Sequence, residues 1–583
     1  MPGTPNEHRR SSSFAKLEPF QASEQQGSRA TTSPAVATKQ EASTVVGTPT
    51  IKREASTSSV KQVAIEETDY EPSKRAIESH GGYDILPLSK LGESLNRLIP
   101  DVPLVDEMGV IDLRALTLSL QSGIHAEVRF ALDHLTVVSM DPRITLDLEK
   151  CDDLTDVLVD CGEDQLEFLS EEAVEVSDAL DLPAYEDVVR ACRAEAETLQ
   201  DVSAIGTTAY DMDRAADRLV AVTQLLRNLS FNESNHRLLS TPSVIGFVSN
   251  AIRLLGTRNL LLRNYKNVAD FYKDMITFLS NITGGLELPS RDDALHILQF
   301  ILVFAPQPPP CLSGNVPLRF GSYVPLAHRQ LPLAVDCLAK LLARQEPNRT
   351  LYSGIFTSSH SANSSEAISC SELLTSAFGL SISVLPERSK RLLSSQTEMR
   401  TVEARKAVLT QGMLAADILA SMIAATGQVS EAGEVNLARA WLESEDRWAG
   451  GLLHMAYVLL VDPRQHAQSQ AQRTQNGHMP VMEPDHQSYG LITHRGLQML
   501  VRLVEKAGMR SSQKGKGMRQ GGRTDDGAVK HDMVDDYDDD DCLVDMVQGD
   551  PRPMRETVIG ALGMPEVDKT ALRLLCGLYE MVG

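Results

Sequence analysis

The chain alternates between segments with a helical hydrophobic period and segments that are almost wholly polar. In residues 112–123, Asp112 stands at an N-cap position and Gly123 follows as a helix stop. The same spacing of apolar residues in 128–138 and 154–161 predicts two further amphipathic helices. The buried face of the first helix is defined by Leu113, Leu116 and Leu120.

Two stretches suggest an internal repeat. The sequence LLRNLSFNESNHRLL at 225–239 is similar to FLSNITGGLEL at 278–288, and each contains the end of a predicted amphipathic helix. A second helix comes after each stretch. Thr241 is expected to cap one of these second helices, with Pro242 as its first residue, and Ser290 is expected to cap the other.

A third helix pair is predicted at 331–349 and 371–385, the two separated by a Ser/Asn-rich loop. The pitch is 53 residues from Leu229 to Ile282 and 59 from Ile282 to Leu341. It exceeds the roughly 40 to 47 residues of HEAT and armadillo repeats, so we expect long inserted loops. The pattern predicts an all-α fold, an armadillo/HEAT-like α-solenoid. More helices are expected at 403–426, 435–461, 490–507, 555–562 and 567–582.

The polar segments define the domain organisation. Residues 1–78 are rich in Ser and Thr, poor in large apolar side chains, and predicted to be a disordered tail. Residues 79–583 are predicted to form one helical-repeat domain. Residues 162–201 carry thirteen acidic side chains against two arginines, which favours a solvated loop. Disordered insertions are expected near 162–210, 305–330, 353–368, 464–486 and 509–550.

Charge and cysteine usage narrow the class of protein. The net charge of -23 and the pI near 5.1 argue against general coating of nucleic acid or of an anionic membrane. Eight scattered cysteines without a C-x-x-C predict reduced thiols in the cytosol or nucleus. The best apolar run, residues 413–425, is too short for a membrane span and contains Asp417, so no membrane contact is expected.

Two segments carry a family resemblance. EMGVIDLRALTLSLQSGIHAEVRFALDHLTVVS at 107–139, together with LLRNLSFNESNHRLL, resembles the C-terminal helical region of the large subunit of fungal SWI/SNF chromatin remodellers. That subunit also carries an AT-rich-interaction domain (ARID), and its animal counterparts share both patterns. The resemblance is good over about 82–300 and looser to 583.

The resemblance implies a nuclear, non-catalytic scaffold that supports transcription regulation and holds remodeller subunits together, including a separate ATPase. The sister RSC-type remodeller has a similar subunit, so the resemblance does not decide which of the two complexes contains this chain. An ARID would lie upstream, and residues 1–78 are too short and polar to contain it, which puts direct DNA binding in doubt. Histones are candidate ligands of the acidic loops.

Motifs for catalysis, cofactors and metals are missing from the sequence. Phosphate loops, G-x-G-x-x-G, H-E-x-x-H, G-x-S-x-G and paired metal-ligand spacings do not occur in a usable context. We therefore expect neither an enzyme nor a cofactor. The L-x-x-L-L pattern LAKLL at 338–342 lies on a predicted repeat helix and is interpreted as core.

Asn228 and Asn281 occupy matching places near the ends of two repeat helices. An amide that both donates and accepts could bind the backbone of an extended peptide, as in an armadillo-type adaptor of transport or signalling. The alternative is that both residues cap or turn the helix ends. These two residues are the candidates for a protein-binding groove.

Two further sets of residues are candidate sites. In the tail, IKRE around Lys52 resembles a SUMO acceptor, and RRSSS around Ser12 resembles a kinase site, although such short patterns arise often by chance. A cluster of basic residues without interleaved acids could bind DNA, act as an import signal, or be a plain flexible loop. It consists of Lys506, Arg510, Lys514, Lys516, Arg519 and Arg523.

Overall fold

The computed structural model describes most of the chain between residues 102 and 582, together with residues 86 and 90–92. The tail at 1–78, with Lys52 and Ser12, lies outside the described residues, as do the whole of 509–550 and the predicted insertion at 464–486 except for His486. Within 102–582 the gaps are 152, 199–201, 313–316, 358–368, 387–394, 424–435, 462–485, 509–557, 560–561 and 563–567.

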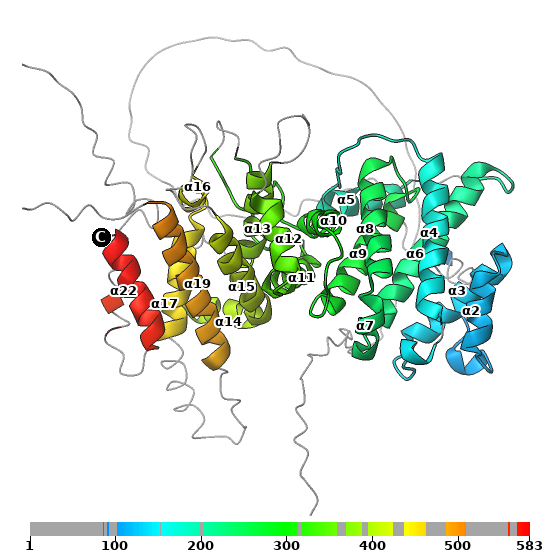
Figure 1. Ribbon diagram of the computed structural model, residues 1–583, viewed down its shortest axis with the longest axis horizontal. Helices are drawn as coiled ribbons and strands as arrows, with labels where there is room; N and C mark the ends of the chain where they lie inside the picture. Colours follow the sequence, from blue (N-terminus) through cyan, green and yellow to red (C-terminus); the bar gives the residue numbers. More distant parts are fainter. Residues whose placement is uncertain are drawn as a thin grey trace, which may run out of the picture. The chain divides into compact units, whose positions relative to one another are not determined.

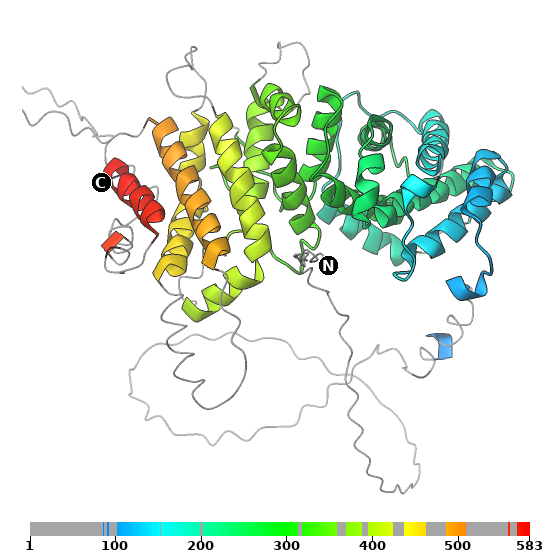
Figure 2. The ribbon, with the colours of Figure 1, turned by 60° about the horizontal axis from the view of Figure 1, so that its bottom comes forward.

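Residues 100–583 form one compact unit whose helices stack in two layers (Figures 1 and 2). In the first layer each helix contacts the next one in the series: α3 (His125–Met140), α6 (Thr208–Leu229), α9 (Tyr265–Ile282), α11 (Leu331–Ala343), α15 (Lys406–Met422), α19 (His486–Lys506) and α22 (Lys569–Val582). The second layer contains α2 (Leu113–Gln121), α4 (Leu154–Glu172), α8 (Pro242–Thr257), α10 (Arg291–Leu302), α12 (Asn348–Thr357), α13 (Cys370–Ser383) and α16 (Leu437–Leu442).

Shorter elements complete the stack. They are α5 (Tyr185–Ala196), α7 (His236–Leu239), α14 (Ser395–Ala404), α17 (Trp448–Val461) and the 3-10 turns Val105–Glu107, Leu148–Lys150 and Glu233–Asn235. Among the described residues the sole strand-like pairing is an isolated bridge between Glu175 and Arg258. The predicted all-α solenoid is confirmed.

Apolar stripes explain why the helices stack. The buried side chains of α6 recur every three or four residues, so one face of the helix is removed from water. Burying a leucine contributes about 2 kcal/mol, and no single helix could gain this without its neighbours. The stripe comprises Leu219, Val222, Leu225, Leu226 and Leu229, each at most 4% exposed.

Several predicted helix ends are confirmed. The Asp112 carboxylate accepts the backbone N–H groups of Arg114 and Ala115, and Gly123 follows α2 with a φ of +65°. Pro242 begins α8, and the Ser290 hydroxyl accepts the N–H of Asp293 at the start of α10.

The prediction of an open acidic loop at 162–210 is wrong for much of that segment. Helix α4 continues to Glu172, and α5 occupies Tyr185–Ala196. The acidic residues lie on the solvent side, while Leu166 and Leu169 are buried. Apolar burial on one face therefore outweighs repulsion between exposed carboxylates, which water screens.

Two other helix predictions need correction. Helix α12 occupies Asn348–Thr357, where we expected the end of one helix and the start of an insertion at 353–368, whose remainder lies outside the described residues. The helix expected at 435–461 is broken into α16 and α17. The intervening turn includes Arg447, which has a φ of +52° that a helix cannot accommodate.

The two tryptophans of the chain close the core between α13, α16 and α17. Trp441 stacks on Phe378 with ring centroids 3.9 Å apart, and its indole N–H donates to the Thr375 hydroxyl at 3.0 Å. Trp448 donates to the Trp441 carbonyl at 2.8 Å. Both indoles are fully buried, so their fluorescence would report on this part of the stack alone.

The remaining predictions concern α11 and the segment at 305–330 that precedes it. The three leucines of LAKLL are buried on α11, so their interpretation as core is confirmed. The described part of the insertion at 305–330 contains no helix, and it places Phe320 in the core against Phe378.

Candidate functional site

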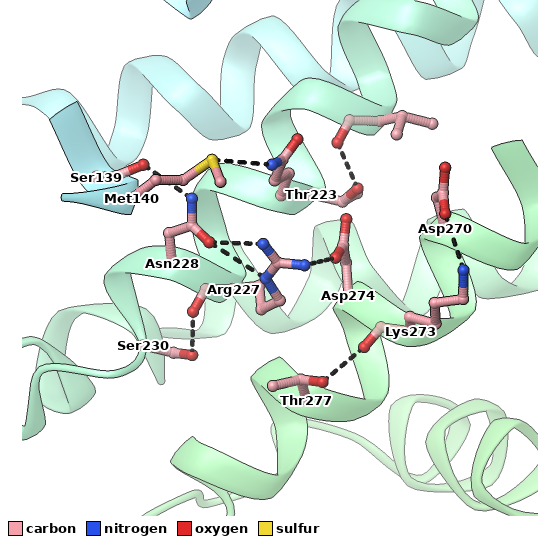
Figure 3. A network of polar contacts seen from close by, with 12 residues as sticks. Ser139, Met140, Thr223, Arg227, Asn228, Ser230, Asp270, Lys273, Asp274 and Thr277 are labelled. Atoms are coloured by element: carbon pink, nitrogen blue, oxygen red, sulfur yellow. Dashed lines mark hydrogen bonds and ion pairs between the residues drawn. The ribbon is translucent and has the colours of Figure 1, made fainter. Parts of the chain in front are cut away.

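A series of polar side chains links successive helices of the first layer, and its centre is shown in Figure 3. The Asn228 amide on α6 donates to the Ser139 hydroxyl on α3 at 2.9 Å. Its carbonyl oxygen accepts two N–H groups of Arg227, at 2.8 and 3.2 Å. Both sides of the Asn228 amide are therefore engaged within the chain.

Arg227 continues this series to α9. Its guanidinium forms an ion pair with Asp274 at 2.5 Å, and Asp274 is 4% exposed. Burial raises the pKa of the Asp274 carboxyl from its ordinary 3.8 to about 6, the Asp270 charge also raises it, and Arg227 opposes the rise. The pair thus places a carboxyl that titrates near neutral pH between two repeat helices.

Asn281 forms the next link. Its amide donates to the Ser230 hydroxyl at 2.9 Å, which joins α9 to the end of α6. One residue earlier, Ser280 donates to Asp336 on α11 at 2.8 Å, and Lys340 of α11 donates to the Ser280 carbonyl at 2.8 Å.

The structure brings the two predicted groove residues into one interhelix series. Because Asn228 and Asn281 bond to side chains of neighbouring helices, they have a role in packing. Neither residue is the C-cap of its helix, which is Ser230 in α6 and Thr283 in α9. Peptide binding by these residues remains a prediction.

The ion pair of Arg227 with Asp274 was not predicted from the sequence. The available signal is an acidic residue on the apolar face of a helix, since Asp274 lies between the buried Phe271 and Phe278. Such a position requires a partner of opposite charge. Periodicity alone could not identify Arg227 as that partner, because the two residues are 47 apart in sequence.

Only the first residue of the predicted basic cluster is described. Lys506 donates to the carbonyls of Ala420, Ser421 and Ile423 at the end of α15, at 3.0, 2.7 and 2.6 Å. Burial lowers its pKa. Lys506 therefore holds α19 against α15 rather than facing a ligand. The other five residues, Arg510, Lys514, Lys516, Arg519 and Arg523, lie outside the described residues.

Helix α4 carries several acidic side chains on its exposed face. Its exposed side includes Asp160, Glu163, Asp164 and Glu167, none of which is in an ion pair with another described residue. Burial and the neighbouring Asp160 and Asp164 raise the pKa of Glu163. The face is negative and open to solvent.

In the part of the chain that the structure describes, no group of three or more His, Cys, Asp and Glu side chains could hold a metal ion. No single described helix is long and apolar enough to cross a membrane. The bent helix pair Glu233–Leu239 and Pro242–Thr257 could span a membrane by length and composition alone. Its apolar side chains, however, are part of the hydrophobic core.

The known proteins that match this chain are subunits of SWI/SNF chromatin-remodelling complexes. No family model matches the chain. The SWI/SNF chromatin-remodeling complex subunit sol1 of Schizosaccharomyces pombe is 28% identical over 361 residues, which cover 58% of this chain and 40% of the relative. The subunit SWI1 of Saccharomyces cerevisiae is 23% identical over 406 residues, which cover 51% and 31%.

The resemblance stated from residues 107–139 and 225–239 is confirmed, since both matched relatives are subunits of SWI/SNF chromatin-remodelling complexes. The chain spans less than half the length of the curated relatives that it matches.

Proposed function

We propose that the chain is a non-catalytic scaffold subunit of a SWI/SNF-type ATP-dependent chromatin-remodelling complex in the nucleus. The observation that carries the proposal is the match to two subunits of such complexes by a chain whose described part is a two-layer helix stack. Stacked helices present a long surface built from many short elements, which suits simultaneous contact with several proteins.

The partners in this proposal are the other remodeller subunits, including the ATPase. Histones are proposed as ligands of the acidic segments, because their basic tails complement the exposed carboxylates of α4. An RSC-type complex is the alternative assembly within the same proposal.

Affinity purification of the tagged chain from nuclear extract tests the proposal. We expect a remodelling ATPase and further complex subunits in stable amounts, at a salt concentration that removes weak ionic contacts. The purified chain alone should show no ATP turnover. Recovery of the chain alone, or with cytosolic partners only, would contradict the proposal.

The rival function is that of an armadillo-type adaptor in which Asn228 and Asn281 bind an extended peptide. The contacts described above weigh against it, because the peptide would have to displace Ser139 and Ser230 from these amides. Binding of an extended peptide by the full chain, abolished by Asn281→Ala, would favour the adaptor instead.

A further inference from the structure

Asn235 holds the connector between α3 and α4 by two backbone hydrogen bonds. Its side-chain oxygen accepts the N–H of Leu148 at 2.9 Å, and its amide nitrogen donates to the carbonyl of Leu146 at 2.9 Å. Asn235 is fully buried. We call this arrangement an asparagine clamp.

A second asparagine clamp lies further along the chain. Asn348, also fully buried, accepts the N–H of Leu288 at 2.9 Å and donates to the carbonyl of Leu286 at 3.0 Å. The clamped segment is the connector between α9 and α10. The two clamps thus use the same side chain and the same pair of backbone groups, with distances that agree within 0.1 Å.

The surrounding sequence repeats as well. Both connectors read leucine, acidic residue, leucine, and all four leucines are at most 9% exposed. Both asparagines follow a buried leucine, Leu229 or Leu342, at the same spacing of six residues. Each stands at the start of a short helix, α7 in one case and α12 in the other.

The order of helices around the clamps is the same. In both places the chain forms a first-layer helix, the clamped connector, a second-layer helix and another first-layer helix. A shorter helix that begins at or directly after the clamping asparagine and a second-layer helix then follow. The first series is α3, α4, α6, α7 and α8, and the second is α9, α10, α11, α12 and α13. The insertion between the second and third helix differs: the first series contains α5, and the second contains irregular chain.

The clamp meets a physical need at this point of the fold. A connector between two layers has backbone N–H and C=O groups outside any helix, and buried groups of this kind require partners. One primary amide can satisfy a donor and an acceptor two residues apart. The clamp therefore ties the turn after α6 back to the connector between α3 and α4, and the turn after α11 back to the connector between α9 and α10.

We propose that residues 125–257 and 265–383 are two copies of one five-helix module, each closed by its own asparagine clamp, and that each module opens as a separate unit. The modules meet where α6 and α5 pack on α9 and where α8 packs on α10. The contacts across this boundary include the Arg227–Asp274 pair, the bond from Asn281 to Ser230 and the bonds from the Tyr265 N–H to Glu195. This inference does not depend on the identity of the partners.

Amide hydrogen exchange of the full chain, resolved by mass spectrometry, tests the proposal. The Leu148 and Leu288 amides donate directly to the clamps, so they are the reporters. Asn235→Ala should accelerate exchange at Leu148 about tenfold or more while Leu288 keeps its wild-type rate. Asn348→Ala should give the reverse. Asn250→Ala, on the outer side of α8, is the matched control and should change neither rate.

Tryptophan emission verifies that the rest of the stack is intact, because Trp441 and Trp448 lie outside both modules. Acceleration of both reporters in either variant, or of neither, overturns the proposal.

If a variant fails to fold, the wild-type chain in increasing denaturant provides a second test. The Leu148 and Leu239 amides should share one opening free energy, and the Leu288 and Leu351 amides should share another. A single value for all four amides contradicts two separate modules.

Discussion

At the scale of single residues, the polar groups between α6 and α9 combine burial with pairing. Asp274 is almost fully buried, which raises the pKa of its carboxyl, and Arg227 at 2.5 Å opposes that rise. Breaking such a pair by removing one partner leaves a buried group without compensation, which costs more than the pair itself contributes.

The Asp274 carboxyl should make stability depend on pH. Its folded pKa of about 6 lies above its ordinary value of 3.8, so folding favours the protonated form. Relative to Asp274→Asn, the wild-type chain should therefore lose stability as pH rises from 4 to 7, by an amount on the order of 3 kcal/mol. Urea unfolding of both proteins by circular dichroism measures this difference. Parallel stability curves over that pH range would refute the assignment.

Asn228 should prove to be a packing residue. Asn228→Ala removes the acceptor of two Arg227 N–H groups and the donor to Ser139, so we expect a loss of about 1–3 kcal/mol in the free energy of unfolding. The control is Asn250→Ala, which loses only a surface contact to Arg253. Equal stability of the two variants would show that the Asn228 contacts contribute little.

Sequence reasoning succeeded at this scale where the signal was local. Asp112, Pro242 and Ser290 were placed correctly, because capping depends on the next three residues. The Arg227–Asp274 pair and the clamping role of Asn235 were missed, since their partners lie 47 and 87 residues away in sequence. Such contacts depend on how the helices stack.

At the scale of elements, α5 supports the start of α9 although it lies in a segment that we predicted to be a loop. The carboxylate of Glu195, near the end of α5, accepts the backbone N–H groups of Tyr265 and Lys266 at 2.9 to 3.3 Å. An anion at this position also interacts favourably with the helix dipole. The sequence did not predict α5, because the seven acidic residues between 163 and 178, just before Tyr185, favoured a solvated loop.

Removal of the Glu195 carboxylate should loosen the start of α9. Glu195→Ala should lower the free energy of unfolding by about 1–2 kcal/mol and accelerate amide exchange at Tyr265 and Lys266. Glu197→Ala, at an exposed position just after α5, is the matched control and should leave both unchanged. Unchanged exchange in the Glu195 variant would mean that Asn264 alone caps the helix.

At the scale of the whole molecule, the described helices form a two-layer stack. The fold class was predictable, because the helical period continues from one predicted element to the next. The two-module organisation was not, because the insertions in the two modules differ in length and hide the shared order of helices.

The acidic face of α4 should contribute to histone binding if the proposed function is correct. Neutralising Asp160, Glu163, Asp164 and Glu167 by amide substitutions should weaken binding of a lysine-rich histone tail peptide about tenfold at low salt. Fluorescence anisotropy of a labelled peptide measures the effect. The control neutralises four exposed carboxylates on other elements: Glu197, Asp292, Glu403 and Glu505. Equal weakening in both variants would indicate net charge rather than this face.

Cross-linking mass spectrometry of the affinity-purified assembly tests the scaffold role most directly. Described lysines are distributed along the stack, from Lys150 and Lys266 to Lys406 and Lys569. The account predicts cross-links from several of these positions to different remodeller subunits, the ATPase among them. Cross-links confined to one short peptide beside Asn228 and Asn281, or an assembly without remodeller subunits, would contradict it.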